Sequence, residues 1–331
     1  MRYHVRMFEV MTIGAATQDI FVKSKQFERI PNDSAPDGWN ACLPLGAKIP
    51  IDELVFETGG GATNAAVTFA RLGFKTTCVA CVGDDPGGRE IIAGLKAEKI
   101  NVRGAQQTTA YRTATSIILV AGTGNRAILV ARGASAHLDR RAIDWTSLRS
   151  RWIYLTSVAG NFALLTDLFA HAQKSLTHVA WNPGKLEIVH GFKKLLPFLL
   201  HTDVLLLNRE EAAELSSCSP RDIPCILKTL GHLPRRALVV TDGAHGATAN
   251  ACGHTWHAAP LKGKIVNTTG AGDAFGSAFI ASLMKNGTIE TALRVATRNA
   301  FSVVQHMGAK RGILEAYPSA RDLARIHVTS L

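Results

Sequence analysis

The chain has 331 residues, of which 47% are hydrophobic and 19% charged, as is typical of a folded globular protein. Its formal net charge of +11 permits an anionic partner, but the basic residues are scattered and form no run with interleaved aromatic residues. We therefore expect no nucleic-acid partner. No apolar run approaches the ~20 residues that a membrane-spanning helix needs, so no membrane partner is expected either.

The six cysteines are far apart except for Cys78 and Cys81, which form a lone C-x-x-C pair. A zinc or redox site would use such a pair, but no second Cys/His pair has metal-ligand spacing. We therefore interpret Cys78 and Cys81 as core residues of an apolar strand. The N-terminal segment lacks the apolar stretch and cleavage site of a signal peptide. These features predict an intracellular, cytoplasmic protein with reduced cysteines.

Apolar runs that end in a polar residue or a turn alternate with helical patterns along the chain. Strands are expected at 8–14, 76–83, 151–157, 177–183, 202–208 and 236–243, with a short strand-like run at 264–266. Helices are expected at 62–72, 86–98, 162–175, 209–216, 221–231, 272–286 and 289–306. This alternation favours an α/β fold with a largely parallel sheet that helices cover on both faces. Ligands of such sheets bind at the carboxyl ends of the strands.

Two segments interrupt this alternation. Residues 18–57 contain several prolines and no convincing helix, and so long a connection is uncommon unless it is functional. Residues 113–133 contain two β-rich runs that flank Gly122-Thr123-Gly124-Asn125, which is a strong hairpin signal. We interpret the two segments together as a small β-layer that covers the ligand end of the sheet. A further hairpin at 247–259 is expected to extend the edge of the main sheet.

The stretch from Gly270 to Asp273 stands where a helix is expected to begin. Its glycines leave the unpaired N–H groups of the first turn uncovered at the positive end of the helix dipole, which suits an anion. Asp273 beside that anion makes sense if its carboxylate takes the proton of an attacking hydroxyl. An ordinary N-cap aspartate would give the same pattern, so the residues alone leave both interpretations open. Gly270-x-Gly272-x-x-x-Gly276 does not have the spacing of the dinucleotide-binding fingerprint, and no βαβ unit follows it.

A second glycine-rich stretch covers residues 57–73. Gly59, Gly60 and Gly61 lead into a helix of small residues, and Asn64 lies in its first turn. The glycines would let a ligand lie against the backbone, and the Asn64 amide offers both a donor and an acceptor. Close packing of the helix on the sheet would need the same small residues, and both interpretations can hold together.

Several motifs occur in one order along the chain. "GGGATNAAVTFARLG" and "CVGDDPGG" precede "WNPG", "LLLNREEAAEL" and "VVTDGAHGA", and "NTTGAGDAFGSAFIASL" follows them. In sequence and spacing they resemble the ribokinase family of sugar and nucleoside kinases, also called the phosphofructokinase-B-like (PfkB) carbohydrate kinases. The resemblance covers essentially the whole chain. It implies one ribokinase-like α/β domain over residues 1–331, a three-layer sandwich with a mostly parallel central sheet, and a small β-sheet lid formed by 18–57 and 113–131.

The resemblance further implies an ATP-dependent kinase that uses Mg²⁺ and transfers the γ-phosphoryl group to a hydroxyl of a sugar or sugar-like small molecule. Asp273 corresponds to the catalytic base, and Gly270, Ala271 and Gly272 to the anion hole. The positions that correspond to acceptor-binding residues are Asp19, Gly60, Gly61 and Asn64. Those that correspond to nucleotide-binding residues are Asn182, Asn208, Thr241, Gly243 and Gly246. Glu211 corresponds to the residue that holds Mg²⁺ through metal-bound water.

The chain departs from the family pattern at two motif positions. The second signature often begins with Asp where this chain has Asn267, and a neutral amide holds a cation less well, so we expect weak or absent activation by K⁺. Ribokinase itself carries Lys at the position of Gly61, which weakens a specific assignment to ribose.

Three further expectations follow from the resemblance. The lid segment 18–57 is longer than in ribokinase, so the acceptor pocket would have a different shape. A nucleoside kinase and a catalytically silent sugar-binding regulator are the alternatives. The outer face of the lid would suit a homodimer, as in many relatives.

Overall fold

A nine-stranded sheet forms the centre of the molecule, of which the computed structural model describes residues 7–32, 34, 38–121 and 126–331. The strands lie in the order β17 (Val328–Ser330), β16 (His254–Ala258), β15 (Ala247–Ala251), β14 (Ala237–Thr241), β13 (Val204–Asn208), β12 (His178–Trp181), β11 (Ser150–Leu155), β1 (Phe8–Ile13) and β6 (Thr76–Val79). The strands from β14 to β6 are parallel, and the edge strands β15, β16 and β17 pair antiparallel. The hairpin expected at 247–259 thus extends the main sheet.

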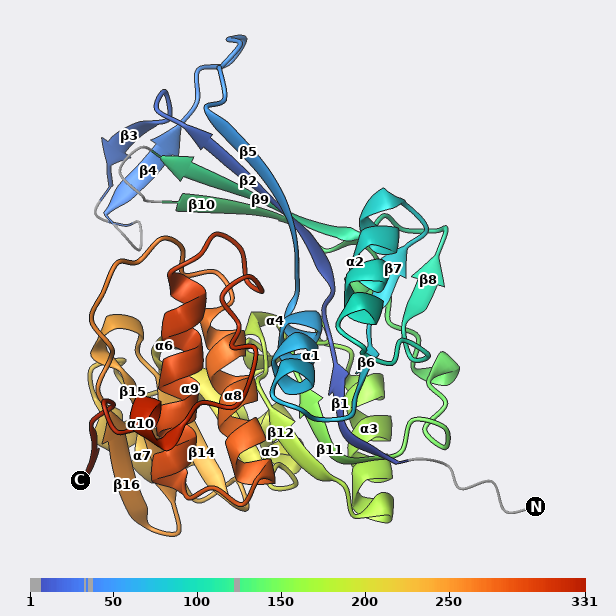
Figure 1. Cartoon of the computed structure of the whole chain (residues 1–331), viewed down its shortest axis with the longest axis vertical. Coiled ribbons are helices and arrows are strands. Elements are labelled where there is room, and N and C mark those ends of the chain that lie inside the picture. The colour runs from blue at the N-terminus through green and yellow to red at the C-terminus, as the bar shows by residue number, and fades with distance from the viewer. Residues whose placement is uncertain (1–6, 33, 35–37, 122–125) are drawn as a thin grey trace.

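Helices cover both faces of this sheet (Figure 1). One face packs against α3 (Phe162–Ser175), α4 (Lys185–Ile188), α5 (Phe192–Leu199), α6 (Arg209–Ser216) and α7 (Ile223–Leu230). The other packs against α1 (Gly61–Arg71), α8 (Ala271–Met284), α9 (Ile289–Val304) and α10 (Ala320–Leu323), while α2 (Pro86–Ala97) lies beside α1. Alternate side chains of each strand divide between the two cores: on β11, Ile153 and Leu155 enter the first and Trp152 and Tyr154 the second. The predicted α/β fold with a largely parallel sheet is confirmed.

A second, smaller sheet extends away from this body and lies above α8 and α9 in Figure 1. Its strands lie in the order β10 (Arg126–Ala131), β9 (Ala114–Ala121), β2 (Thr17–Ser24) and β5 (Glu53–Gly59). A hairpin of β3 (Glu28–Pro31) and β4 (Trp39–Cys42) joins β2 to β5. The two segments that interrupted the alternation therefore do form one β-layer, although the expected turn at 122–125 lies outside the described residues.

The apolar run at 76–83 forms two strands instead of the single one expected. β6 joins the main sheet, whereas β7 (Cys81–Gly83) pairs in parallel with β8 (Gln106–Thr108) in a sheet of their own. Cys78 and Cys81 are both buried, in agreement with a core role. Burial raises the pKa of the Cys78 thiol to about 11, so this thiol stays protonated and unreactive near neutral pH.

One local prediction is wrong, and one helix was not predicted. Residues 264–266 form no strand, because the N–H groups of Val266 and Asn267 both donate to the Val304 carbonyl at the end of α9 and tie the segment to that helix. The sequence also gave no indication of α5, since Pro197 lies inside it and interrupts the helical pattern. The described part of the chain also contains three short 3₁₀ turns: η1 (Gly133–His137), η2 (Arg140–Ala142) and η3 (Gly243–His245).

The cysteines are not all reduced as expected, because Cys218 and Cys225 form a disulfide. The turn from the end of α6 to the start of α7 brings their Cα atoms to 6.1 Å, a proximity that a spacing of seven residues did not suggest. Among the described residues, no helix is long and apolar enough to cross a bilayer.

Candidate active site

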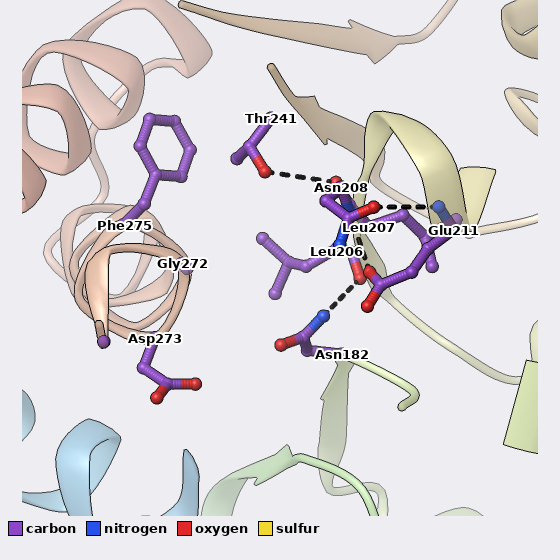
Figure 2. Close-up of a pocket in the computed structure, with 11 residues that line it drawn as sticks. Asn182, Leu206, Leu207, Asn208, Glu211, Thr241, Gly272, Asp273 and Phe275 are labelled. Atoms are coloured by element: carbon purple, nitrogen blue, oxygen red, sulfur yellow. Dashed lines mark hydrogen bonds between the residues drawn. The ribbon is translucent and has the colours of Figure 1, made fainter. Parts of the chain in front are cut away.

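A cavity of about 210 Å³ opens at the carboxyl ends of β12, β13 and β14. Figure 2 shows the first turn of α8 on one side of it, and Asn182, Asn208, Glu211 and Thr241 on the other. Its lining residues are Asn182, Leu206, Leu207, Asn208, Glu211, Thr241, Gly270, Gly272, Asp273, Phe275 and Gly276. The fold thus brings the glycine-rich turn together with most of the polar positions that follow the strands.

The first turn of α8 depends on its glycines in two different ways. Gly270 is the N-cap with φ 78°, and a Cβ there would lie 2.4 Å from the Ala309 Cβ, so only glycine fits. A Cβ on Gly272 would meet no described atom within 4 Å outside its own helix, so this residue faces open space. The N–H of Ala271 donates to the Thr268 carbonyl at 3.3 Å. The groups left to face an anion are the N–H groups of Gly272 and Asp273.

Asp273 links this turn to the second glycine-rich motif. Asn64 donates from Nδ2 to Asp273 Oδ2 at 2.8 Å, which fixes the direction of the carboxylate. Burial raises the pKa of Asp273 above its usual value, and the Asn64 hydrogen bond opposes that rise. The Oδ1 atom of Asn64 is buried and has no hydrogen-bond partner among the described residues, so a ligand hydroxyl could supply the missing donor.

The other acceptor-side positions lie next to Asn64, outside the lining of the cavity. Asp19 of β2 is buried, accepts a hydrogen bond from Thr17 Oγ1 at 3.1 Å, and has a pKa raised by burial. Gly59 has to be a glycine, because a Cβ there would lie 2.0 Å from Asp19 Oδ2. Gly60 has φ 96° and approaches the Ala15 carbonyl, while Gly61 packs on Thr156. All three glycines allow close packing, but only the contact of Gly61 with Thr156 is one of the helix with the main sheet, and a ligand lying against the glycines stays a prediction.

On the sheet side of the cavity, Asn208 and Glu211 form a capping box at the start of α6. The Asn208 side chain accepts from the Glu211 N–H at 2.8 Å, and Glu211 Oε2 accepts from the Asn208 N–H at 2.9 Å. Asn182 donates to the Leu206 carbonyl at 2.9 Å, and Thr241 pairs with Asn208 across β13 and β14. These contacts hold the four polar residues at the rim of the cavity (Figure 2).

The loop after β14 carries the remaining predicted positions, Gly243 and Gly246. Gly246 has φ 94°, and a Cβ there would lie 2.1 Å from the Ala258 carbonyl oxygen. The N–H of Asp242 donates to the Gly246 carbonyl at 2.8 Å, which closes the turn, while Gly243 faces open space. Neither glycine lines the cavity; of the predicted positions on β14 and its loop, only Thr241 does.

The site has residues that fit a magnesium ion. Burial raises the pKa of Glu211, and the neighbouring carboxylates of Glu210, Asp273 and Glu214 raise it further, so an added cation would stabilise this group. Mg²⁺ is usually held by one or two carboxylates together with phosphate oxygens and water. Among the described residues, no cluster of three or more His, Cys, Asp or Glu could hold a metal on its own.

Asn267 is buried beside the same turn. Its Oδ1 accepts from the Thr269 N–H at 2.6 Å, and its Nδ2 points to the Met307 sulfur at 3.7 Å. The amide oxygen is therefore already engaged, in keeping with the weak K⁺ activation expected from the sequence, which stays a prediction.

Three charged residues of the acceptor side were missed in the sequence. Lys310 reaches from the loop after α9 to Thr58, and Glu57 pairs with Arg311 at 2.6 Å. The loop has no periodic pattern, and its contacts join segments about 250 positions apart, so only the folded chain reveals them.

The fold and the cavity define a class of protein: an α/β protein in which an open helix start lies beside a buried carboxylate, an arrangement that suits phosphate chemistry. A family model described as "pfkB family carbohydrate kinase" matches residues 40–316. Ribokinase from Schizosaccharomyces pombe is 27% identical over 321 residues, 93% of this chain and 95% of that protein. Fructokinase from Escherichia coli is 28% identical over 281 residues, 80% and 90% of the two chains.

Solved structures share the fold over nearly the whole chain. Adenosine kinase from Sinorhizobium meliloti has a TM-score of 0.78 at 20% identity and covers 93% of this chain and 97% of its own. Arabidopsis thaliana ribokinase, complexed with ribose and ATP, has a TM-score of 0.72 at 19% identity, covering 96% and 98%. The chain belongs to the pfkB family of carbohydrate kinases, which confirms the resemblance and the class of enzyme inferred from the sequence.

Proposed function

We propose that this protein transfers the γ-phosphoryl group of ATP to a hydroxyl of a sugar or sugar-like small molecule. The observation that carries the proposal is the position of Asp273. Its carboxylate lies between the cavity bounded by Asn208 and Thr241 and the acceptor-side residue Asn64. A base in that position can reach a hydroxyl on one side while the phosphate lies on the other.

The proposed reaction balances without a further reactant. The acceptor oxygen attacks the γ-phosphorus, the bond from that phosphorus to the bridging oxygen of ADP breaks, and the hydroxyl proton passes to Asp273. The N–H groups of Gly272 and Asp273 face the transferring group and stabilise the charge on its oxygens. Phosphoryl transfer depends mainly on such positioning and charge neutralisation, which matches a site built from helix N–H groups and few charged side chains.

We assign the nucleotide to the cavity side and the acceptor to the side of Asp19 and Asn64. Glu211 would hold Mg²⁺ through water, and Asn182 and Asn208 would lie near the phosphates. When bound, Mg²⁺ supplies positive charge to the β- and γ-phosphates.

The small sheet acts, in this proposal, as the lid of the acceptor side. Asp19 and Glu57 lie on its strands β2 and β5, which supports that role. Covering the acceptor excludes water, the competing nucleophile. Slower protease cleavage within 43–50 when acceptor and nucleotide are bound is expected, and equal cleavage in both conditions would count against the lid.

The relatives named ribokinase and fructokinase favour a sugar over a nucleoside as the acceptor. A nucleoside base would need an aromatic side chain on which to stack. Phe21 is buried in the small sheet, and Arg29 lies 4.5 Å from the centre of the Trp39 ring. Burial removes Phe21 as a stacking partner, whereas Trp39 is 40% exposed, so a nucleoside stays the alternative acceptor.

The proposal is tested by an ADP-release screen over pentoses, hexoses, sugar acids, inositol and nucleosides, repeated with Asp273→Asn. This change keeps the size of the side chain and removes only the base, so kcat should fall at least ~100-fold while ATP affinity stays nearly constant. The control is Asp144→Asn, because Asp144 is an exposed residue of the turn before β11, at the opposite end of the sheet. Binding of a sugar without turnover by the wild type would instead favour a silent regulator.

A further inference from the structure

Lys310 brings an ammonium group into the acceptor side of the site. Its Nζ donates to the Thr58 carbonyl oxygen at 2.7 Å and to Thr58 Oγ1 at 3.1 Å. An ammonium has three N–H groups, so these bonds leave one without an assigned acceptor. Thr58 directly precedes the glycine turn that leads to Asn64, and Lys310 interacts with the charges of Asp19 and Asp273, so the ammonium lies near the acceptor-side residues.

The negative charges around Lys310 do not pair with it directly. Asp19, Glu57 and Asp273 are close enough to interact with its charge, but no carboxylate of the described residues lies within 4.0 Å of Nζ. Glu57 already pairs with Arg311 at 2.6 Å. Asp273 is hydrogen-bonded to Asn64, and Asp19 to Thr17. Each neighbouring carboxylate therefore has another partner.

The protonation balance of Lys310 agrees with this geometry. Burial lowers the pKa of Lys310 to about 8, although Asp19, Cys78, Asp273 and Glu57 all act to raise it. The ammonium is therefore undercompensated in the folded chain, since the surrounding negative charge does not offset its loss of water. A negative group on a bound ligand would supply that compensation.

We propose that the acceptor carries a carboxylate, as a sugar acid does, and that Lys310 selects it by donating its third N–H to that group. Asp19 and the unpartnered Oδ1 of Asn64 would then accept hydrogen bonds from hydroxyls of the same molecule. A singly charged carboxylate fits better than a phosphate dianion, because Asp19 and Asp273 lie nearby and would repel the second charge. The inference rests on the proposed kinase function and names the substrate class of that site.

A purely structural role for Lys310 makes a different prediction. The lysine also fastens its loop to β5 through Thr58, and Arg71 donates to the Lys310 carbonyl at 3.3 Å. If fastening were its only task, removing the ammonium would impair charged and neutral acceptors alike. Selection of a carboxylate predicts a much larger loss for the charged acceptor than for the neutral one.

The test compares kcat/KM for D-gluconate with D-glucose, D-ribonate with D-ribose, and D-glucose 6-phosphate. In the wild type, kcat/KM for the preferred sugar acid should exceed that for the corresponding neutral sugar by at least about 10-fold. Lys310→Met should lower this ratio by about 10- to 100-fold, as expected for the loss of a hydrogen bond to a charged group. The kcat/KM for the neutral sugars should fall by a clearly smaller factor than that for the acids, because the lost fastening to Thr58 affects both. Lys96→Met, an exposed lysine of α2, is the matched control. An equal loss for both acceptors, or a wild-type preference for the neutral sugar or the phosphate, would overturn the proposal.

Calorimetric binding of D-gluconate and D-ribonate without ATP separates this inference from the kinase proposal. Turnover of neutral sugars without a preference for acids refutes the inference and leaves the kinase function intact. Acid binding that Lys310→Met abolishes, in a protein that phosphorylates nothing in the panel, supports the inference and refutes the kinase function. If Lys310→Met does not fold in a thermal-unfolding scan, the wild-type preference between acid and neutral sugar decides.

Discussion

At the residue scale, Asn64 and Asp273 act as a coupled pair whose pKa can be measured. Burial raises the pKa of Asp273 above 3.8, and the Asn64 hydrogen bond lowers it because that bond favours the charged form. A base works only when ionised, so kcat/KM for the acceptor should fall as pH drops through the raised pKa. Asn64→Ala should raise the pKa of Asp273 further and move the acid limb of the profile to higher pH.

The measurement is kcat/KM for the acceptor against pH at saturating MgATP. Asn64→Ala also weakens acceptor binding, but that loss changes the height of the profile and leaves its midpoint in place. An acid limb that keeps its midpoint in Asn64→Ala would show that Asp273 is not the group that titrates.

The role of a single residue could be predicted from the sequence only where the residue stands in a recognisable motif. Asp273 and Asn64 stand in glycine-rich helix starts, so their chemistry was readable locally, although not the 2.8 Å bond that joins them. Lys310 stands in a loop without periodicity, and its partner Thr58 is 252 positions away. Nothing local distinguishes such a lysine from an exposed one, because only its folded environment removes water from it.

At the element scale, the first turn of α8 separates stability from phosphate binding. Gly272→Leu should fold normally, because its side chain enters open space, and should lose both turnover and nucleotide phosphate affinity. Gly270→Ala should instead lower the free energy of unfolding by about 1–3 kcal/mol, since φ 78° and the nearby Ala309 strain any side chain there. Thermal unfolding measures the stability of both variants, and ATP titration measures their nucleotide affinity. A Gly272→Leu variant that is destabilised but turns over normally would contradict this division of roles.

The start of α6 gives a second test at this scale. Glu211→Gln preserves an oxygen that can accept from the Asn208 N–H, so the capping box survives while the charge is lost. The Mg²⁺ concentration for half-maximal rate should rise about 10-fold or more, and acceptor KM should change little. The rate is measured against free Mg²⁺. An unchanged Mg²⁺ dependence would remove Glu211 from the metal site, as would full turnover in excess chelator.

Elements with a clear period were predictable, and elements shaped by long-range contacts were not. The helices expected at 162–175 and 209–216 have those bounds, because the spacing of their apolar residues is helical and the N-cap residues Asn161 and Asn208 mark their starts. The run at 264–266 has the composition of a strand, yet its N–H groups bond to α9. The split of 76–83 between two sheets likewise depends on β8, which is too short to detect.

At the scale of the whole molecule, the register of the small sheet gives it two unlike faces. Side chains alternate along each strand, and Asp19 and Phe21 of β2 are buried on the face toward the site. The opposite face continues across paired strands from Leu54 and Phe56 of β5 to Leu129 of β10, which are 50%, 51% and 55% exposed. Contiguous exposed apolar surface of this kind is typical of an interface between proteins.

We therefore expect wild-type protein to form a homodimer through this outer face, detected as twice the chain mass by size exclusion with light scattering. Phe56→Glu and Leu129→Glu should each give monomers, because a carboxylate buried in an apolar contact loses its water without gaining a partner. Val130→Glu places the same charge on an equally exposed neighbour of β10 that points to the other face, so it should leave the dimer intact. A monomeric wild type, or dissociation by all three variants alike, would contradict the assignment of this face.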